Sequence, residues 1–231
     1  MCTLEKRGNI YFLTLTGSDE HRLTPTLIDS IRSALHRLRT ESSTSPCFAL
    51  ITTAHGKFFS NGLELAYAKS NLSKPQSGPS TLELLVSELI SLPMPTIAAV
   101  NGHASAAGMI LALSHDYVVM RKDRGFLYMS EMDIGLVIPN WFVRLLKCKI
   151  GDAKVRQEVI MMAKKLTAEM AVERGIVHSA HDSAEATVDA AVRLGEELVK
   201  RGWNGAVYGK NRMVLFDEVL NHEKIKTVSK L

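Results

Sequence analysis

The sequence contains few cysteines and no long apolar run, and each shortage excludes a class of protein. Only Cys2, Cys47 and Cys148 occur in 231 residues, far apart and without CxxC spacing. This pattern predicts free thiols in a reducing compartment, and neither a disulfide framework nor a zinc site. No segment reaches the roughly 20 consecutive apolar residues that a membrane-spanning helix needs. We therefore expect no membrane insertion and no bound metal.

Charge of one sign is also scarce. The chain has 28 basic and 24 acidic residues, which gives a formal net charge of +4. Its basic residues form only short clusters, at 122–124 and 147–149, without interleaved aromatic residues. Proteins that read nucleic acid usually show a basic stripe or a recognisable module, so no nucleic-acid partner is expected. Charge also appears within the first five residues, which argues against a secretory signal.

Strand and helix patterns alternate over the first 135 or so residues. Runs rich in apolar and β-forming residues predict strands over 9–15, 47–53, 96–100 and 117–120. Apolar residues at helical spacing predict helices over 24–40 and 80–92. Such alternation indicates an α/β fold with a parallel sheet covered by helices. Beyond Pro139 the patterns are helical, which predicts an α-helical tail for the remainder of the chain.

Two segments share one design, an apolar strand that turns through small residues into a helix. They are "FFSNGLEL" at 58–65 and "NGHASAAGMILAL" at 101–113. The first turn of a helix leaves backbone N–H groups unpaired at the positive end of its dipole, and small side chains keep them accessible. Two such groups converging on one oxygen form an oxyanion hole. Close packing alone is the other explanation for small residues at these junctions.

Taken together, the two segments resemble the enoyl-CoA hydratase/isomerase (crotonase) superfamily, with its FSxGxD/E and NGxAxGGG elements. Gly62-Leu63-Glu64 occupy the first element, Asn101-Gly102 and Ala106-Ala107-Gly108 the second, and Asp116 a following acidic position. The resemblance implies a crotonase fold, a spiral of ββα units with a C-terminal α-helical region. We expect a core over residues 1–180 and the helical region over 181–231. It also implies a homotrimer or a dimer of trimers.

The same resemblance implies roles for individual residues. The oxyanion donors would be the N–H groups of Leu63 and Ala107. The substrate thioester and pantetheine would be lined by Ser60, Asn61, Gly62, Leu63, Glu64, Leu65 and Gly108. No metal or redox cofactor is expected, because coenzyme A arrives as part of a fatty acyl-CoA substrate.

One acidic position separates the activities within the superfamily. Hydratases carry a glutamate on the helix after the glycine run, where this chain has Ile110. The second acidic position matches at Glu131, four residues before Gly135, and "GLVIPNW" at 135–141 is similar to the Δ3,Δ2-enoyl-CoA isomerases. That similarity implies that Glu131 moves a proton from C2 to C4 of a 3-enoyl-CoA. Glu64 and Asp133 are the rival acids.

Three other functions stay open from the sequence alone. The chain could be an enoyl-CoA hydratase or an acyl-CoA hydrolase of the same fold, or a non-catalytic acyl-CoA-binding protein. Glu131 could, by periodicity alone, be a surface residue or the partner in a buried ion pair.

The last three residues predict a location. Ser229, Lys230 and Leu231 form the tripeptide that the peroxisomal import receptor reads as an address. We therefore expect the import receptor as a partner and the peroxisome as the compartment, whose oxidative and lipid chemistry agrees with an acyl-CoA substrate.

Overall fold

Two sheets, parallel except for the edge strand β1, form the framework of the protein. The computed structural model describes residues 1–42, 47–67 and 78–220. The predicted targeting tripeptide Ser229-Lys230-Leu231 lies outside the described residues. The larger sheet has the order β1-β2-β3-β5-β7-β9, from β1 (Cys2–Arg7), β2 (Ile10–Leu15), β3 (Ala49–Ala54), β5 (Thr96–Val100), β7 (Tyr117–Arg121) and β9 (Ser179–His181). Only β1 runs antiparallel, paired with β2.

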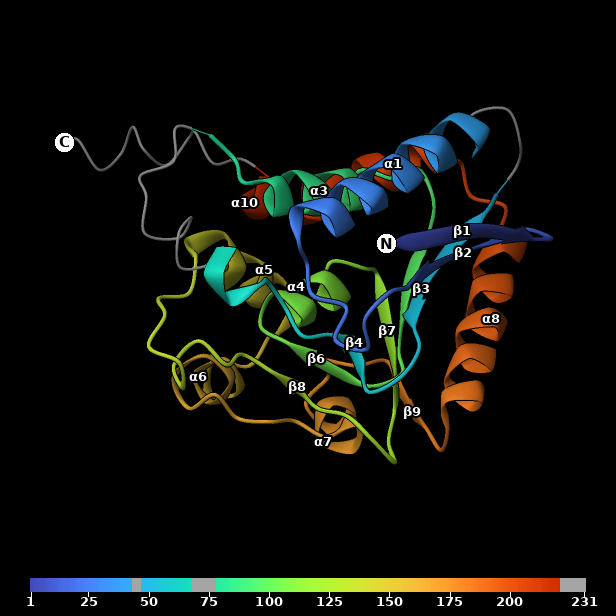
Figure 1. Ribbon diagram of the computed structural model, residues 1–231. Coiled ribbons are helices and arrows are strands. Elements are labelled where there is room, and N and C mark those ends of the chain that lie inside the picture. Colours follow the sequence, from blue (N-terminus) through green and yellow to red (C-terminus); the bar gives the residue numbers. More distant parts are fainter. Residues whose placement is uncertain (43–46, 68–77, 221–231) are drawn as a thin grey trace.

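The smaller sheet consists of the second strand of each repeating unit. Its order is β4-β6-β8, from β4 (Phe58–Ser60), β6 (His103–Ser105) and β8 (Leu127–Tyr128). The pairs β3-β4, β5-β6 and β7-β8 each place one strand in the large sheet and the next strand in the small sheet (Figure 1). This arrangement is the predicted spiral, in which the chain turns at the end of every large-sheet strand.

Helices follow these strand pairs and fill the C-terminal part. They are α1 (Pro25–Ser42), α3 (Thr81–Ile90), α4 (Ala107–Leu113), α5 (Asn140–Lys149), α6 (Ala153–Met161), α7 (Ala168–Glu173), α8 (Ala184–Lys200), α9 (Gly205–Leu215) and α10 (Asp217–Leu220). Helix α1 begins as predicted, with Pro25 in the first helical position and the Thr24 hydroxyl accepting from Leu27 N. Ser80 and Glu83 form a capping box at the start of α3.

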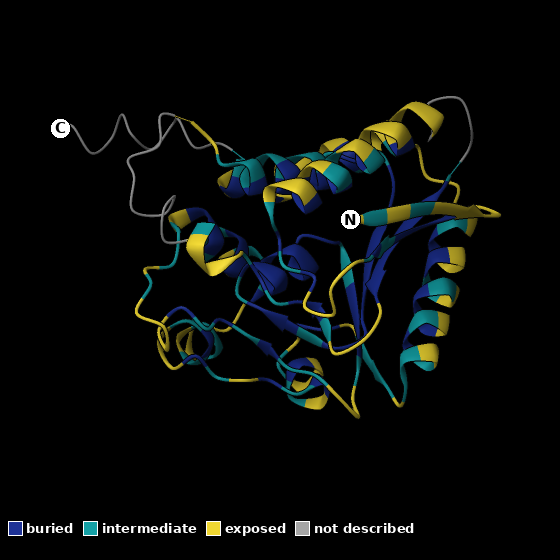
Figure 2. Cartoon of the chain, in the orientation of Figure 1, coloured by how far each residue is buried: buried dark blue, intermediate teal, exposed yellow. Residues whose placement is uncertain are grey.

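The large sheet is covered on both faces, which explains the unbroken apolar runs in its strands. Along β5, Ile97 and Ala99 face a cluster that includes Ala191 and Leu198 of α8, while Ala98 faces the main core. Figure 1 shows α8 against one face of the sheet and α1 and α3 beyond the other. Buried residues fill the centre, and the outer sides of these helices are exposed (Figure 2).

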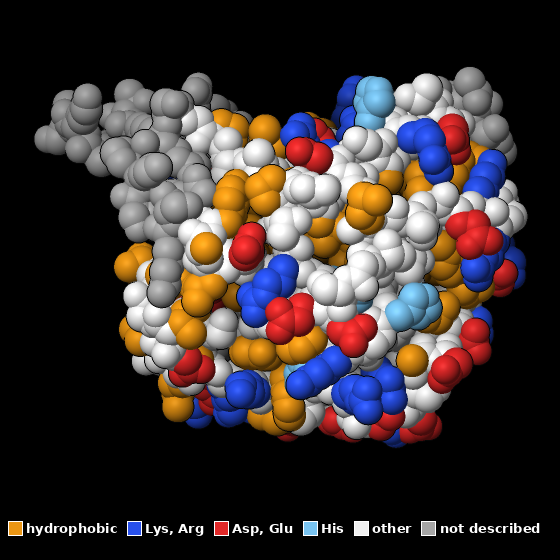
Figure 3. All heavy atoms as spheres, in the orientation of Figure 1, with side chains coloured by type: hydrophobic (Ala, Val, Ile, Leu, Met, Phe, Trp, Pro, Cys, Tyr) orange, Lys and Arg blue, Asp and Glu red, His pale blue; other side chains and the backbone are white. Residues whose placement is uncertain are grey.

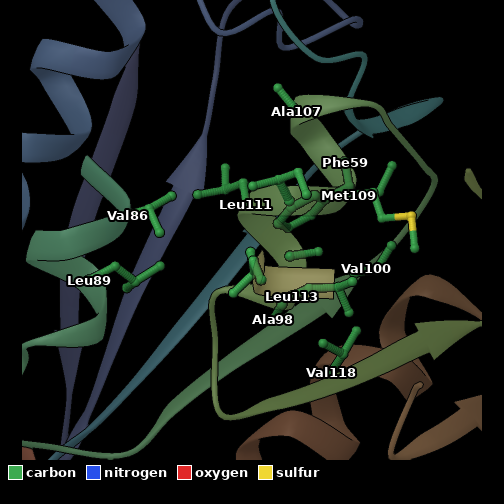
Figure 4. Packing of buried hydrophobic residues seen from close by; sticks show 14 of the residues in the cluster. Phe59, Val86, Leu89, Ala98, Val100, Ala107, Met109, Leu111, Leu113 and Val118 are labelled. Carbon is green, nitrogen blue, oxygen red and sulfur yellow. The ribbon is translucent and has the colours of Figure 1, made fainter. Parts of the chain in front are cut away.

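Helix α4 is buried on all sides. Each of its residues from Ala107 to Leu113 is inaccessible or nearly so. Its apolar side chains lie between α3 and the strands β5 and β7, with Ala107 at the start of the helix (Figure 4). Complete burial explains why this segment carries no charged residue, and it fixes the position of the first turn of the helix.

The sequence reading missed several strands. It predicted an α-helical tail after about residue 135, and that was wrong for β9, which pairs in parallel with β7. It also missed β1 and the second strands β6 and β8. These strands are two to six residues long, and β1 is mostly exposed, so neither length nor apolar alternation marks them.

The surface agrees with the balanced composition. On the face drawn in Figure 3, basic and acidic side chains are interspersed. Within the described ranges no helix is both long and apolar enough to cross a membrane. The predicted division at residue 180 stays a prediction, and α8 from the second part packs on the sheet of the first.

Candidate active site

The first of the two segments predicted to form the oxyanion hole, 58–65, turns directly after β4, and we call it the first cradle; the segment 101–113 is the second cradle. Gly62 has a φ of +73°, a left-handed conformation that favours glycine. A Cβ atom on Gly62 would lie 2.9 Å from Ser105 O and 3.3 Å from Ala107 N. These contacts require a residue without a side chain, and they show that the two cradles lie against each other.

The second cradle is the junction of β6 with α4. Ala106 has φ +51° and ψ −122°, which L-residues rarely adopt, and it leads into Ala107, the first residue of α4. A Cβ atom on Gly108 would overlap the backbone carbonyl of Ser60. Glycine at 108 therefore lets α4 begin directly on β4, although alanines occupy the two preceding positions.

The two residues predicted to supply the oxyanion donors line one cavity. Gly62 O accepts a hydrogen bond from Leu23 N at 2.8 Å. In a trans peptide the C=O and N–H groups point in opposite directions, so the Leu63 N–H points away from Leu23. Ala107 N has no acceptor one turn earlier in its helix. Neither N–H donates to any acceptor in the described part of the chain. Leu63 and Ala107 both line the cavity.

This cavity has a volume of about 270 Å³ and is mainly apolar. Its described lining is Arg22, Asn61, Leu63, Leu65, Ser105, Ala106, Ala107, Tyr128, Ser130, Glu131, Ile134, Leu136, Pro139 and Phe142. Most of these residues come from both cradles, from β8 and the segment after it, and from the start of α5, while Arg22 lies between β2 and α1. Loops that follow successive strands of the small sheet thus meet at one place.

Glu131 is the carboxylate of the cavity. Its side chain is buried, with 5% of its surface exposed, and its Oε2 atom has no hydrogen-bond partner among the described residues. Burial raises its pKa from 4.5 to about 7. A bond from Leu136 N to Glu131 O, at 2.9 Å, closes the turn that positions it. A buried carboxylate with one unpartnered oxygen, lining a mainly apolar cavity, is suited to exchanging a proton near neutral pH.

The predicted substrate-binding residues divide into two groups. Asn61, Leu63 and Leu65 line the cavity. Ser60 is fully buried, and its hydroxyl donates to His21 O at 2.8 Å and accepts from Gly62 N at 3.3 Å. Ser60 therefore braces the turn.

Gly62, Glu64 and Gly108 are also absent from the described lining of the cavity. Gly62 and Gly108 allow close backbone contact, and Glu64 is exposed. The contacts predicted between these residues and a substrate stay predictions.

The other acid positions and the nearby histidines lie outside the described lining of the cavity. Ile110 is completely buried within α4, and Asp133 is exposed. His103 packs between Phe58 and Phe126, at ring distances of 5.1 and 5.5 Å. Burial lowers the pKa of His115 to about 4, which keeps the ring neutral at physiological pH. Glu131 is thus the only carboxylate in the described lining.

Sequence reasoning did not identify four polar lining residues, which are Arg22, Ser105, Tyr128 and Ser130. Ser130 is adjacent to Glu131, so its position could have suggested it. Arg22 contacts the first cradle across about 40 residues of sequence, and no local pattern indicates such a contact.

The fold and the cavity define a protein of the crotonase class, in which Leu63, Ala107 and the buried acid Glu131 line one cavity. The profile of the enoyl-CoA hydratase/isomerase family matches residues 5–224, and the chain belongs to this family. This membership agrees with the spiral of strand pairs.

Named relatives are similar over nearly the whole chain. The chain is 57% identical to "Enoyl-CoA delta isomerase 1, peroxisomal" of Arabidopsis thaliana, covering 96% of this chain and 92% of the relative. It is 51% identical to "Enoyl-CoA delta isomerase 2, peroxisomal" of the same plant, covering 95% and 93%.

Solved structures show the same fold at low sequence identity. A structure titled as an apo enoyl-CoA isomerase of Mtb superposes with a TM-score of 0.82 at 20% identity, covering 95% of this chain and 92% of the other. An enoyl-CoA hydratase of Mycobacterium marinum superposes with a TM-score of 0.80 at 22% identity, covering 95% and 92%.

Proposed function

We propose that the protein is a peroxisomal Δ3,Δ2-enoyl-CoA isomerase that converts 3-cis- and 3-trans-enoyl-CoA to 2-trans-enoyl-CoA. The observation that carries the proposal is Glu131, the only carboxylate in the described lining of a cavity that Leu63 and Ala107 also line. The two Arabidopsis relatives, which are named enoyl-CoA delta isomerases, support the same reaction. Such a reaction serves the β-oxidation of unsaturated fatty acids.

In the proposed mechanism one carboxylate performs both proton transfers. Glu131 takes a proton from C2 of the 3-enoyl thioester, and negative charge moves onto the thioester oxygen. The N–H groups of Leu63 and Ala107 stabilise this charge, in the manner of an oxyanion hole. Glu131 then returns the proton to C4 as the double bond moves to C2–C3. The substrate and product have the same atoms, so no water or redox partner is consumed.

The pKa of Glu131 suits this work. General acid–base catalysis is most effective when the catalytic group has a pKa near the working pH. Burial sets the Glu131 pKa at about 7, so the group gives and takes a proton with little bias. An exposed glutamate would hold its proton too weakly to return it readily.

Hydration is disfavoured by the position that the hydratases fill with a second glutamate. Ile110 is buried in the core and carries no group that could hold a water molecule. Addition of water across a 2-enoyl thioester requires a group that holds and activates the water molecule. The alternatives of hydratase, acyl-CoA hydrolase and binding protein therefore have less support than isomerisation.

A direct assay separates these functions. Purified protein is given 3-hexenoyl-CoA, and formation of the conjugated product is followed by absorbance beside hydration of 2-hexenoyl-CoA. We expect isomerisation to exceed hydration, and Glu131→Gln to lower kcat by at least about 10²-fold. Asp133→Asn, an exposed acid in the same turn, is the control. Hydration faster than isomerisation, or full turnover by Glu131→Gln, would contradict the proposal.

The location and assembly complete the proposal. The names of two relatives include the word peroxisomal, and Ser229-Lys230-Leu231 would supply the import signal. A homotrimer or dimer of trimers is proposed from the family alone, and light scattering of the purified protein tests it. Coenzyme A acts as part of the substrate, and the mechanism requires no metal.

A further inference from the structure

Arg22 is the other charged side chain in the described lining of the cavity, besides Glu131. It lies in the connection between β2 and α1, about two-thirds buried. Its Nη1 atom donates to Asn61 O and to Leu63 O, each at 3.3 Å. Its Nε atom donates to Glu20 Oε2 at 2.6 Å. The guanidinium group is thus held by Glu20 and spans the first cradle.

The two carbonyl groups that Arg22 contacts lie on either side of Gly62. Glycine is conformationally permissive, and the φ of +73° at Gly62 is reached without the restraint of a side chain. The peptide that follows Gly62 carries the Leu63 N–H. Its orientation therefore depends on the contacts of the carbonyl groups around it.

Three of those carbonyl groups are held by one short segment. Leu23 N holds Gly62 O at 2.8 Å, while Arg22 holds the carbonyl before it and the carbonyl after it. With all three oxygens restrained, rotation of the peptide is restricted. The Leu63 N–H then remains directed away from Leu23.

We propose that Arg22 is a positioning residue, whose guanidinium group fixes the carbonyls on both sides of Gly62 and so keeps the Leu63 N–H directed at the thioester oxygen. This inference rests on the proposed function. Arginine suits the role because one Nη atom supplies two hydrogens to two acceptors while Nε pairs with Glu20. Lysine has a compact ammonium without this fixed planar geometry.

The experiment compares Arg22→Lys and Arg22→Ala with the wild-type protein. Arg7→Lys is the matched control, because Arg7 also pairs with a glutamate two residues before it, Glu5, and is exposed. Values of kcat and KM are measured with 3-hexenoyl-CoA and with the 3-hexenoyl thioester of pantetheine, which lacks the nucleotide and its phosphates.

We expect both Arg22 variants to lower kcat by about tenfold or more with either thioester, while KM changes little. Added guanidinium ion should restore part of the kcat of Arg22→Ala. The carbonyl stretching frequency of a bound ¹³C-labelled thioester should also shift less in the variants than in the wild type. A purely structural role would not produce this frequency change or the separation of kcat from KM.

Two results would overturn the inference. An unchanged kcat in folded Arg22→Lys would refute it, and so would a rise in KM confined to the CoA substrate, which would instead indicate a phosphate contact. Circular dichroism establishes folding, and Arg22→Lys decides the matter if Arg22→Ala does not fold. A wild-type protein inactive with both thioesters would refute the proposed function itself.

Discussion

Replacing Glu131 by glutamine should stabilise the protein at neutral and alkaline pH while lowering its activity. Burial raises the Glu131 pKa from 4.5 to about 7, so the folded state holds this proton more tightly than the unfolded state does. The stability that the protonated acid contributes is complete below about pH 4.5 and is lost as the pH rises to about 7. Glutamine does not titrate, so its variant keeps its stability over this range.

The size of the effect follows from the pKa change. Each pKa unit corresponds to about 1.4 kcal/mol, so a rise from 4.5 to about 7 gives about 3 kcal/mol. We compare the free energies of unfolding of Glu131→Gln and the wild type. The difference, variant minus wild type, should increase by about 3 kcal/mol between about pH 4.5 and about pH 8.

Urea unfolding at fixed protein concentration, repeated over this pH range, measures the difference. Asp133→Asn is the control, because Asp133 is an exposed acid in the same turn. A difference between Glu131→Gln and the wild type that does not change with pH, or that falls as the pH rises, would refute the desolvation argument even if the variant were inactive.

Three further predictions concern the same cavity. The kcat/KM for isomerisation should rise with pH through about 7 and then level off, because Glu131 must be ionised to accept the C2 proton; a flat pH–rate profile would contradict this. Gly108→Ala should lower the free energy of unfolding by about 1–3 kcal/mol in urea titrations, because its methyl group would overlap the Ser60 carbonyl. Ala106→Gly should raise that free energy by about 1 kcal/mol, because glycine tolerates a φ of +51° that strains alanine; a less stable variant would show that the Ala106 methyl packing outweighs the strain.

Much of the large sheet could be predicted from the sequence because its strands are buried on both faces. The strand predicted over 96–100 coincides with β5, and the predicted strands over 9–15, 47–53 and 117–120 differ from β2, β3 and β7 by at most two residues at an end. The helix predicted over 24–40 matches α1 closely for a different reason, since Thr24 and Pro25 mark its start chemically. Where burial or capping determines the residue type, the sequence carries the information.

The small sheet could not be predicted in this way. Its strands contain two or three residues each, and β6 lies within a run of small residues that also suits a loop. What defines β6 is its pairing with β4, about 45 positions before it, and with β8, 23 positions after it. Pairing over such separations leaves no periodic signal in one sequence.

The site also contains residues that local motifs indicate and residues that only the three-dimensional fold brings together. Gly62, Gly108 and Glu131 were found through motifs, and the structure gives the reasons for the glycines, which are close contacts with Ser105 and with Ser60. Arg22 was missed because its carbonyl contacts depend on how β2, α1 and the first cradle meet in three dimensions.

The absence of a second acid at position 110 and the burial of Glu131 belong to one design. Helix α4 is enclosed by α3, β5 and β7, so a carboxylate at 110 would carry a large desolvation cost unless a partner or water accompanied it. With Ile110 in that place, the described lining of the cavity holds a single acid, Glu131, whose pKa is set mainly by desolvation. Glu131 is 5% exposed and its Oε2 atom has no described partner, so few water molecules can reach the proton that it carries. Isomerisation needs this proton returned to C4 of the substrate, whereas hydration needs a water molecule placed beside the acid, so burial that excludes water favours isomerisation.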